Sequence, residues 1–146
     1  MATTRTASAR WQGDLPSGNG EVSLGSGRYT GPYTFVSRFE SGEGGTNPEE
    51  LIAAAHASCY SMALSNMLAK EGNPPESVST EAAVTLDTVD GKPTVVRIDL
   101  KTVGKVPGID ADAFRATAEA AKEGCPISRL LAGGSAEITL DVTFEA

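Results

Sequence analysis

Residues 47–70 constrain the fold most, because they predict one long helix. Asn47 is a favoured N-cap residue and Pro48 suits the first helical position. Glu50 follows Asn47 by three positions, the spacing of a capping box, and its charge complements the positive end of the helix dipole. Gly72 marks the expected stop. Apolar residues recur at three- and four-residue steps and predict an apolar stripe made of Ile52, Ala55, Cys59, Met62 and Ala63.

The segments around this helix predict strands, turns and two shorter helices. Alternation and β-branched or aromatic content favour three strands before it, over residues 5–11, 21–24 and 33–39. After it, strands at 77–89 and 93–103 flank a tight turn at Asp90-Gly91. Helices at 109–122, capped by Asp110, and at 126–131 precede a last strand at 136–144. This order is typical of an α+β fold with hairpin-paired antiparallel strands rather than alternating βαβ units.

The length and composition fit one globular domain covering residues 1–146. A chain of 146 residues buries roughly two-thirds of its unfolded surface. Hydrophobic residues make up 40% but aromatic residues only 5%, so the core must be built mainly from Ala, Val, Leu and Ile.

The charge and the apolar runs exclude several classes of protein. A net charge of −7 repels phosphate backbones, and no basic stripe appears, so we expect no nucleic-acid partner. No run reaches the about 18 apolar residues that a membrane span needs. The first residues lack the apolar middle of a secretory signal. We therefore expect a cytoplasmic protein, in which a lasting structural disulfide is uncommon.

The two cysteines stand in unlike contexts. Cys59 lies inside the apolar helical run, where it can be kept dry, whereas Cys125 directly precedes Pro126 at the start of a helix. This asymmetry suits a reactive thiol and a resolving thiol, and the alternative is two cysteines that merely pack. A helix dipole helps only the first turn, and burial raises a thiol pKa, so Cys59 needs a nearby cation to react near neutral pH.

Arg38 is the best candidate for that cation. It stands alone in the predicted strand 33–39, just before the loop that leads to the long helix, and a guanidinium stays charged when buried. A buried Arg needs an acidic partner, and Glu49 in the first helical turn is the natural choice. The alternative is that Arg38 points outward and that Glu49 only complements the helix start.

His56 precedes Cys59 by three residues and therefore shares its helical face. It can act as a base or hydrogen-bond donor to the thiol, as in Cys–His nucleophiles, or it can simply pack or cap. Two Cys and one His, without a close Cys pair, are a poor set of zinc ligands, so we expect no metal.

These motifs together resemble the OsmC/Ohr family of osmotically inducible and organic hydroperoxide resistance proteins. The resemblance runs from residues 11–14 to residues 138–140, and His56 with Ser61-Met62 places it nearer the OsmC branch. The segments that carry it are 38–40 (RFE), 45–51 (GTNPEEL), 54–64 (AAHASCYSMAL), 106–109 (VPGI) and 124–128 (GCPIS).

The resemblance implies an α+β fold with antiparallel sheets, a long central helix and an intertwined homodimer. It implies a thiol-dependent peroxidase in which Cys59 is the peroxidatic thiol and Cys125 the resolving thiol. Arg38 would be the activating guanidinium and Glu49 its partner, with His56 a possible auxiliary. The substrate would be an organic, and in some cases inorganic, hydroperoxide. No cofactor is implied beyond an external dithiol reductant, which in this family is usually a lipoyl dithiol.

Two other classes of function stay open at this point. One is a redox sensor whose disulfide alters a partner surface, although no binding appendage is seen. The other is a carrier of apolar ligands in which the cysteines only line a cavity.

Overall fold

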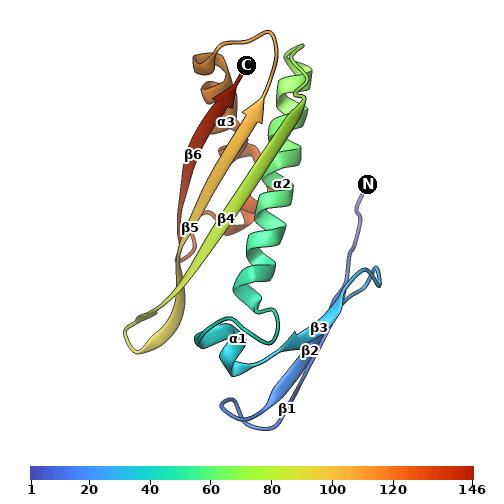
Figure 1. Ribbon diagram of the computed structural model, residues 1–146, viewed down its shortest axis with the longest axis vertical. Helices are drawn as coiled ribbons and strands as arrows, with labels where there is room; N and C mark the ends of the chain where they lie inside the picture. Colours follow the sequence, from blue (N-terminus) through green and yellow to red (C-terminus); the bar gives the residue numbers. More distant parts are fainter. The chain divides into compact units, whose positions relative to one another are not determined.

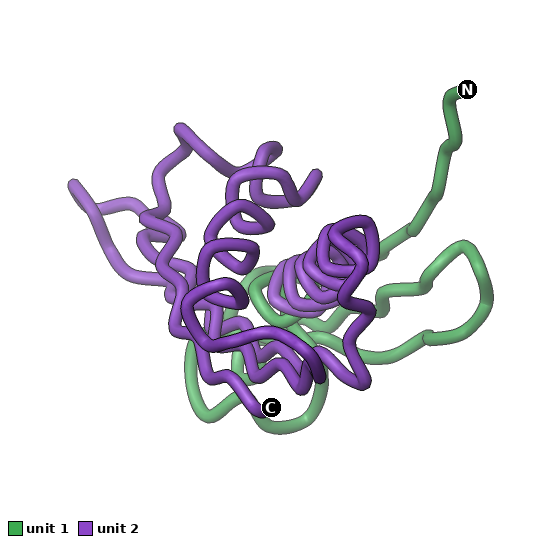
Figure 2. Tube along the Cα trace, turned by 90° about the horizontal axis from the view of Figure 1, so that it is seen from above, with its two compact units in different colours: residues 1–51 green, residues 52–146 purple.

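A computed structural model describes all 146 residues of the chain. It divides into two compact units, residues Met1–Leu51 and Ile52–Ala146, coloured separately in Figure 2. No helix in it combines the length and the apolar character needed to cross a membrane.

The first unit contains a three-stranded antiparallel sheet in the order β1-β2-β3. The strands are β1 (Ala7–Gln12), β2 (Asn19–Leu24) and β3 (Thr30–Tyr33). The first two strands lie close to where the sequence predicts them. The predicted strand at 33–39 is wrong, because β3 ends at Tyr33 and the chain turns into a short helix, α1 (Phe35–Phe39).

Local capping explains why α1 replaces a strand. The backbone N–H of Ser37 donates to Thr34 Oγ1 at 3.1 Å, and the Thr34 N–H donates to Ser37 Oγ at 2.9 Å, which completes a capping box. Ser37 is buried and also donates to the carbonyl of Thr46 at 2.7 Å. These hydrogen bonds outweigh the strand preference of the aromatic residues Tyr33, Phe35 and Phe39.

The long helix forms as predicted and is α2 (Pro48–Lys70). Asn47 Oδ1 accepts the backbone N–H of Glu50 at 2.7 Å, which satisfies one unpaired donor of the first turn. The Glu50 carboxylate accepts from the hydroxyl of Thr46 at 3.2 Å.

The buried stripe of α2 differs from the predicted one. Its fully buried side chains follow one another at steps of four and are His56, Tyr60, Leu64 and Leu68. Ala55 is exposed and Met62 is 74% exposed, so the predicted stripe lies about one residue away from the buried one. Apolar composition alone did not show which face is covered, because most of this helix is apolar or small on every side.

The second unit contains a three-stranded sheet in the order β4-β5-β6. The strands β4 (Ser77–Val89) and β5 (Lys92–Lys105) form an antiparallel hairpin around Asp90 and Gly91. These two residues have φ of 50° and 75°, as a two-residue hairpin turn requires.

One feature of the predicted antiparallel sheets needs correction, although the α+β class is confirmed. Strand β6 (Glu137–Glu145) pairs parallel to β5, from Arg97 opposite Glu137 to Lys105 opposite Glu145. A parallel pair needs a long crossover connection, and α3 (Ala111–Gly124) and α4 (Pro126–Leu131) supply it. Asp110 caps α3 as predicted, through its carboxylate and the N–H of Ala113 at 2.8 Å.

The core of the second unit lies between this sheet and the helices α2 and α3 (Figure 1). Tyr60 and Leu64 pack there with Leu100 and Phe114, and the Tyr60 hydroxyl donates to the carbonyl of Ala118 at 2.9 Å. Gly104 is required opposite Phe114, because a Cβ at this position would overlap the ring. The two faces of β4 alternate: its odd-numbered residues from 77 to 87 are exposed and its even-numbered residues from 78 to 86 are half-buried.

Candidate thiol site

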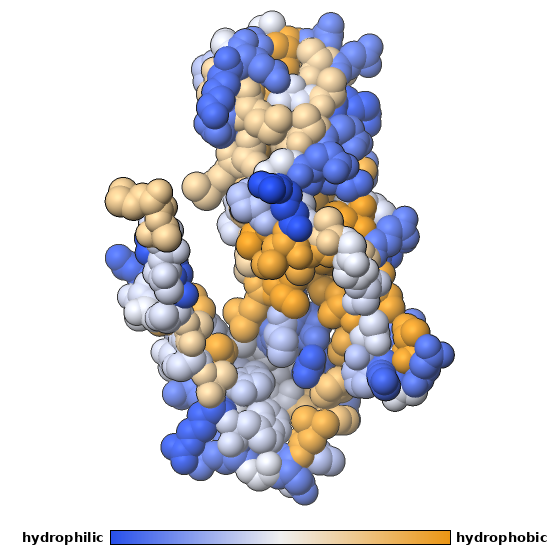
Figure 3. Space-filling model, turned by 180° about the vertical axis from the view of Figure 1, so that it is seen from behind, coloured by the Kyte–Doolittle hydropathy of each residue, from blue (hydrophilic) through white to orange (hydrophobic).

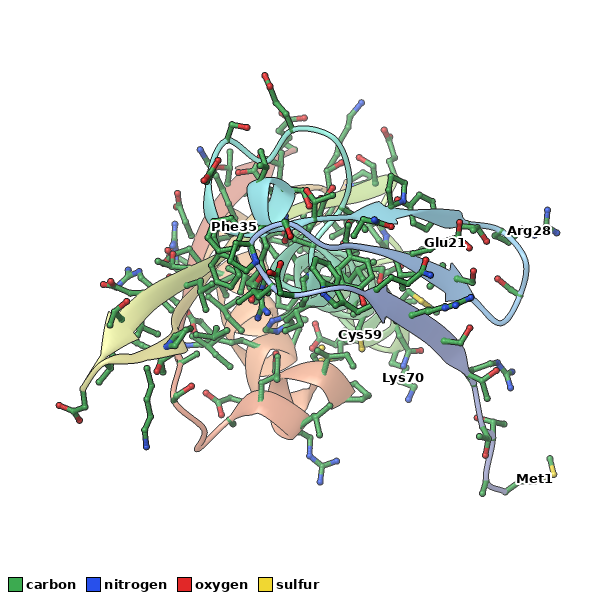
Figure 4. All side chains as sticks on the ribbon, turned by 90° about the horizontal axis from the view of Figure 1, so that it is seen from below. Met1, Glu21, Arg28, Phe35, Cys59 and Lys70 are labelled. Carbon is green, nitrogen blue, oxygen red and sulfur yellow. The ribbon has the colours of Figure 1, made fainter.

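Both cysteines belong to the second unit and both are free thiols. Cys59 lies in the middle of α2 and is half-buried; Figure 4 labels it. Cys125 is fully buried between α3 and α4, where it is the N-cap residue of α4 as predicted. The expectation that Cys59 is the better-shielded thiol is therefore wrong, because Cys125 is the thiol that tertiary packing covers.

The two thiols interact across the break between α3 and α4. Burial raises the pKa of the Cys59 thiol, and a hydrogen bond with the Cys125 side chain raises it further. A hydrogen bond from the backbone N–H of Ile127, the second residue of α4, acts in the opposite direction and lowers the Cys59 pKa. Cys125 and Ile127 thus place a second thiol and a backbone donor against one sulfur.

Sequence reasoning did not find the Ile127 donor. The expectation that a helix dipole gives Cys59 little help holds for its own helix, α2. The donor comes from a different helix, and the only sequence signal for it is Pro126, which starts α4 directly after Cys125.

An open hollow of about 600 Å³ adjoins Cys59. Its other lining residues are Met62, Ala63, Asn66, Met67, Gly124 and Pro126. Met62 and Leu130 of this unit are each 74% exposed. On the face drawn in Figure 3, apolar surface gathers midway along the molecule. A small apolar molecule can therefore reach the Cys59 thiol from this hollow. The Cys125 thiol is buried, but Cys59 can reach it.

His56 is fully buried and lies one turn before Cys59 on α2, but its hydrogen bond goes elsewhere. Its Nε2 atom lies 2.7 Å from Oγ of Ser128, on α4. Its Nδ1 atom has no hydrogen-bond partner. Burial lowers the pKa of His56 below its usual value. No group of three or more His, Cys, Asp or Glu side chains gathers in a way that would hold a metal ion.

Arg38 and Glu49 form an ion pair within the first unit. Arg38 Nη2 donates to Glu49 Oε1 at 2.9 Å, and Arg38 Nε lies 3.3 Å from both carboxylate oxygens. The side chains are 34% and 10% exposed. Arg38 stands in the last turn of α1 rather than in a strand, and its guanidinium carbon lies 5.0 Å above the centre of the Phe39 ring. The predicted pairing of these two residues is therefore present, although the predicted strand is not.

Arg38 also lines a hollow of its own unit. Around it are aromatic and small residues, namely Trp11, Gly13, Leu15, Tyr33, Thr34, Phe35 and Phe39. Only one side of the guanidinium is taken by Glu49, and the Arg38 Nη1 atom makes no hydrogen bond within the chain. The guanidinium can therefore still donate to a polar atom outside this pair.

Two free thiols, of which Cys125 raises the pKa of Cys59 and Cys59 lies beside an open hollow, define a dithiol protein. Comparison with known proteins gives its family. Residues 41–141 match the family described as OsmC-like protein. This chain belongs to the OsmC-like family.

Individual relatives agree with this assignment. The chain is 51% identical over 147 aligned positions to Peroxiredoxin OsmC of Escherichia coli (strain K12), with 100% of both chains covered. It is 31% identical over 105 residues to an organic hydroperoxide resistance protein of Xanthomonas axonopodis pv. citri (strain 306), covering 71% of this chain and 68% of that one.

A solved structure supports the fold. An organic hydroperoxide resistance protein OsmC from Legionella pneumophila superposes with a TM-score of 0.75 at 24% identity, covering 97% of this chain and 99% of that one. The resemblance stated from the sequence motifs is therefore confirmed by independent comparisons.

Proposed function

We propose that this chain is a thiol-dependent peroxidase that reduces organic hydroperoxides. The observation that carries this proposal is the arrangement of the two free thiols. Cys59 meets an open, mostly apolar hollow, and the buried Cys125 thiol is near enough to raise the pKa of Cys59. The relatives named as a peroxiredoxin and as an organic hydroperoxide resistance protein support the same activity.

The first chemical step is oxidation of Cys59. Its thiolate attacks the distal oxygen of the hydroperoxide, the O–O bond breaks, and the alkoxide takes a proton to leave as an alcohol. Cys59 is left as a sulfenic acid, oxidised by two electrons. The Ile127 N–H favours the thiolate over the thiol, but burial opposes it, so a further positive charge is needed.

We assign that charge to Arg38. A guanidinium does not lose its proton when it is partly buried, and Glu49 holds one side of its fork in a fixed plane. The free side of Arg38 would stabilise the Cys59 thiolate and the oxygen on which negative charge develops. In this proposal Glu49 positions Arg38 and does not itself transfer a proton.

The second step protects Cys59. The Cys125 thiol condenses with the sulfenic acid, an S–S bond forms, and one water molecule leaves. An external dithiol, such as a lipoyl-type reductant, then supplies two electrons and two protons and restores both thiols. A resolving thiol close to Cys59 would favour the disulfide over further oxidation by a second peroxide.

The lining of the hollow would favour organic over inorganic peroxides. Met62, Ala63 and Met67 offer apolar surface beside Cys59. Each CH₂ group that leaves water there contributes about 0.8 kcal/mol to binding. Hydrogen peroxide gains nothing from this surface, so it would be the poorer substrate.

The remaining parts of the proposal concern assembly and location. We propose that residues 1–146 work as one OsmC/Ohr-like domain in an intertwined homodimer, supported by the family assignment and by the exposed apolar side chains of Met62 and Leu130. A compartment that keeps thiols reduced, such as the cytoplasm, would be needed to recycle the disulfide.

The decisive experiment measures consumption of tert-butyl hydroperoxide with excess dihydrolipoamide or dithiothreitol. We expect turnover by the unmodified chain and none by Cys59→Ser. Ser58→Ala is the matched control, because Ser58 is an exposed neighbour that only donates back to helix carbonyls. Equal turnover by Cys59→Ser and the unmodified chain would refute the peroxidase and leave a ligand carrier or sensor. Comparing kcat/KM for tert-butyl hydroperoxide with kcat/KM for hydrogen peroxide tests whether organic peroxides are the preferred substrates.

A further inference from the structure

His56 and Ser128 form a buried hydrogen bond that joins α2 to α4. The two residues are 72 positions apart in the sequence, and their Nε2 and Oγ atoms are 2.7 Å apart. His56 is fully buried and Ser128 is 3% exposed. The functional steps described above use neither residue.

The surroundings of His56 do not suit a general base. A proton taken up by the ring would give two N–H donors, but Nδ1 has no hydrogen-bond partner. Burial already lowers the pKa of His56, so the ring is neutral near pH 7. Its hydrogen bond is to Ser128 and not to Cys59. This leaves His56 with a structural bond in the middle of the thiol site.

That bond holds a segment that borders the hollow beside Cys59. Ser128 directly follows Ile127, whose backbone N–H lowers the pKa of the Cys59 thiol, and it lies three residues after Cys125. Gly124 and Pro126, which flank Cys125, line the hollow beside Cys59. Helix α4 has only six residues, too few to be stable without tertiary contacts. The side chain of its N-cap, Cys125, makes no capping hydrogen bond. The segment from Cys125 to Ser128 therefore depends on its contacts with other elements for its position.

We propose that His56 is a positioning residue, whose bond to Ser128 holds the Cys125–Ile127 segment against Cys59 for both oxidation and disulfide formation. The inference deepens the proposed function and rests on it for the meaning of these steps. The bond itself and its effect on the Cys59 thiol can be measured without any peroxide turnover.

The test combines three substitutions. His56→Leu and Ser128→Ala each remove the bond. His56→Gln keeps a side-chain amide that can donate to or accept from the Ser128 hydroxyl, so it should rescue a positioning role but not a base. Ser61→Ala is the matched control, because it removes a different bond of α2, from Ser61 Oγ to Thr80 Oγ1 at 2.8 Å, and leaves α4 untouched.

The first readout is the pH profile of Cys59 alkylation by iodoacetamide, with the labelled residue located by mass spectrometry. The titratable group that the structure places against Cys59 is Cys125, which is present in every variant. If the Ile127 N–H is displaced, the thiolate loses one charge-assisted hydrogen bond. Alkylation at neutral pH should then slow about three- to tenfold in His56→Leu and Ser128→Ala, with the profile shifted to higher pH.

The second readout is the fate of Cys59 after one equivalent of hydroperoxide. His56→Leu and Ser128→Ala should form less Cys59–Cys125 disulfide and more sulfinic acid. The double variant should be no worse than either single variant, because one bond is lost in all three. Circular dichroism at the assay temperature selects the variants that are folded.

Each outcome decides for or against the proposal. Unchanged alkylation and disulfide yield in folded His56→Leu or Ser128→Ala would overturn it. If both variants unfold, the result for His56→Gln decides. A folded His56→Gln protein with slow alkylation of Cys59 would also overturn the proposal, and it would assign the His56 ring a chemical role. If the unmodified chain turns over no peroxide but the alkylation profile of Cys59 still shifts in these variants, the proposed function is refuted and the positioning role stands.

Discussion

Arg38 Nη2 lies 2.9 Å from Glu49 Oε1, so the last turn of α1 is paired with the first turn of α2. The pair joins the only basic residue of α1 to a carboxylate that also lies near the positive end of α2. This one carboxylate fixes the plane of the Arg38 guanidinium. The arrangement suits a guanidinium that must point its free side at a reacting group.

Replacing Arg38 by Met should damage the reactivity of Cys59 more than the fold. Met fills similar volume without charge, and the Arg38 side chain is 34% exposed, so packing should survive. We expect the apparent pKa of Cys59 in the alkylation profile to rise, and each unit corresponds to about 1.4 kcal/mol of lost thiolate stabilisation. Arg38→Lys should recover part of the effect, since it restores charge without the fork. An unchanged thiol pKa in Arg38→Met would mean that the pair is only structural.

Replacing Cys125 by Ser should separate the two steps of the reaction. The first oxidation of Cys59 should persist, because the Ser hydroxyl occupies the same buried position. The sulfenic acid should then be trappable with dimedone and should over-oxidise with excess peroxide. Mass spectrometry that finds an intramolecular disulfide in this variant would contradict the assignment of Cys125, and loss of the first oxidation would assign Cys125 a role in activating Cys59.

Burial of His56 should make stability fall at mildly acidic pH. Its folded pKa lies below the usual 6.5. Between the usual pKa of 6.5 and the lower folded pKa, the unfolded chain binds a proton that the folded chain does not. The free energy of unfolding therefore decreases as the pH falls through this range. For one proton the slope is at most about 1.4 kcal/mol per pH unit, and above about pH 7 this residue contributes none.

Urea unfolding of the unmodified chain and of His56→Gln measures how much His56 contributes to the pH dependence of stability. The two chains should have parallel pH dependence above about pH 7 and should diverge below it, with the Gln variant the flatter one. Asp14 and Asp99, whose pKa values are lowered by hydrogen bonds, titrate at lower pH and are shared by both chains. Identical slopes between about pH 7 and about pH 5 would show that His56 is not the buried group that sets them.

The expected homodimer should be present at micromolar concentration. Met62 and Leu130, each 74% exposed, are the kind of side chain that a partner surface covers. Sedimentation velocity should therefore give about twice the mass of the 15.0 kDa chain. A monomer that retains full peroxide turnover would exclude a role for the dimer in the reaction.

Much of the local structure was predictable because its signals lie within a few residues. Asn47 and Pro48 set the start of α2, and Asp90-Gly91 set the hairpin turn of β4 and β5. The strand predicted over residues 33–39 is wrong for a different reason. Its aromatic alternation resembled a strand, and the reciprocal hydrogen bonds of Thr34 and Ser37, which are equally local, were not recognised.

The candidate site was predictable only in its residue types. The motifs around Cys59 and Cys125 identified the family, and the charge of Arg38 suggested Glu49 as its partner, which the structure shows. Neither the spacing of 66 positions between the cysteines nor the apolar run around Cys59 shows which thiol is covered. Burial depends on which face of α2 packs on the sheet, and nearly every face of this helix is apolar or small.

The sequence by itself determined most of the elements, the family and the residues able to carry thiol chemistry, because caps, turns and motifs act through near neighbours. Tertiary structure alone decided that Cys125 is the covered thiol, that the Ile127 N–H reaches Cys59, and that His56 bonds to Ser128. It also decided that β6 runs parallel to β5. Each of these contacts joins parts of the chain tens of residues apart, and only the packing of the helices α2, α3 and α4 on one sheet brings them together.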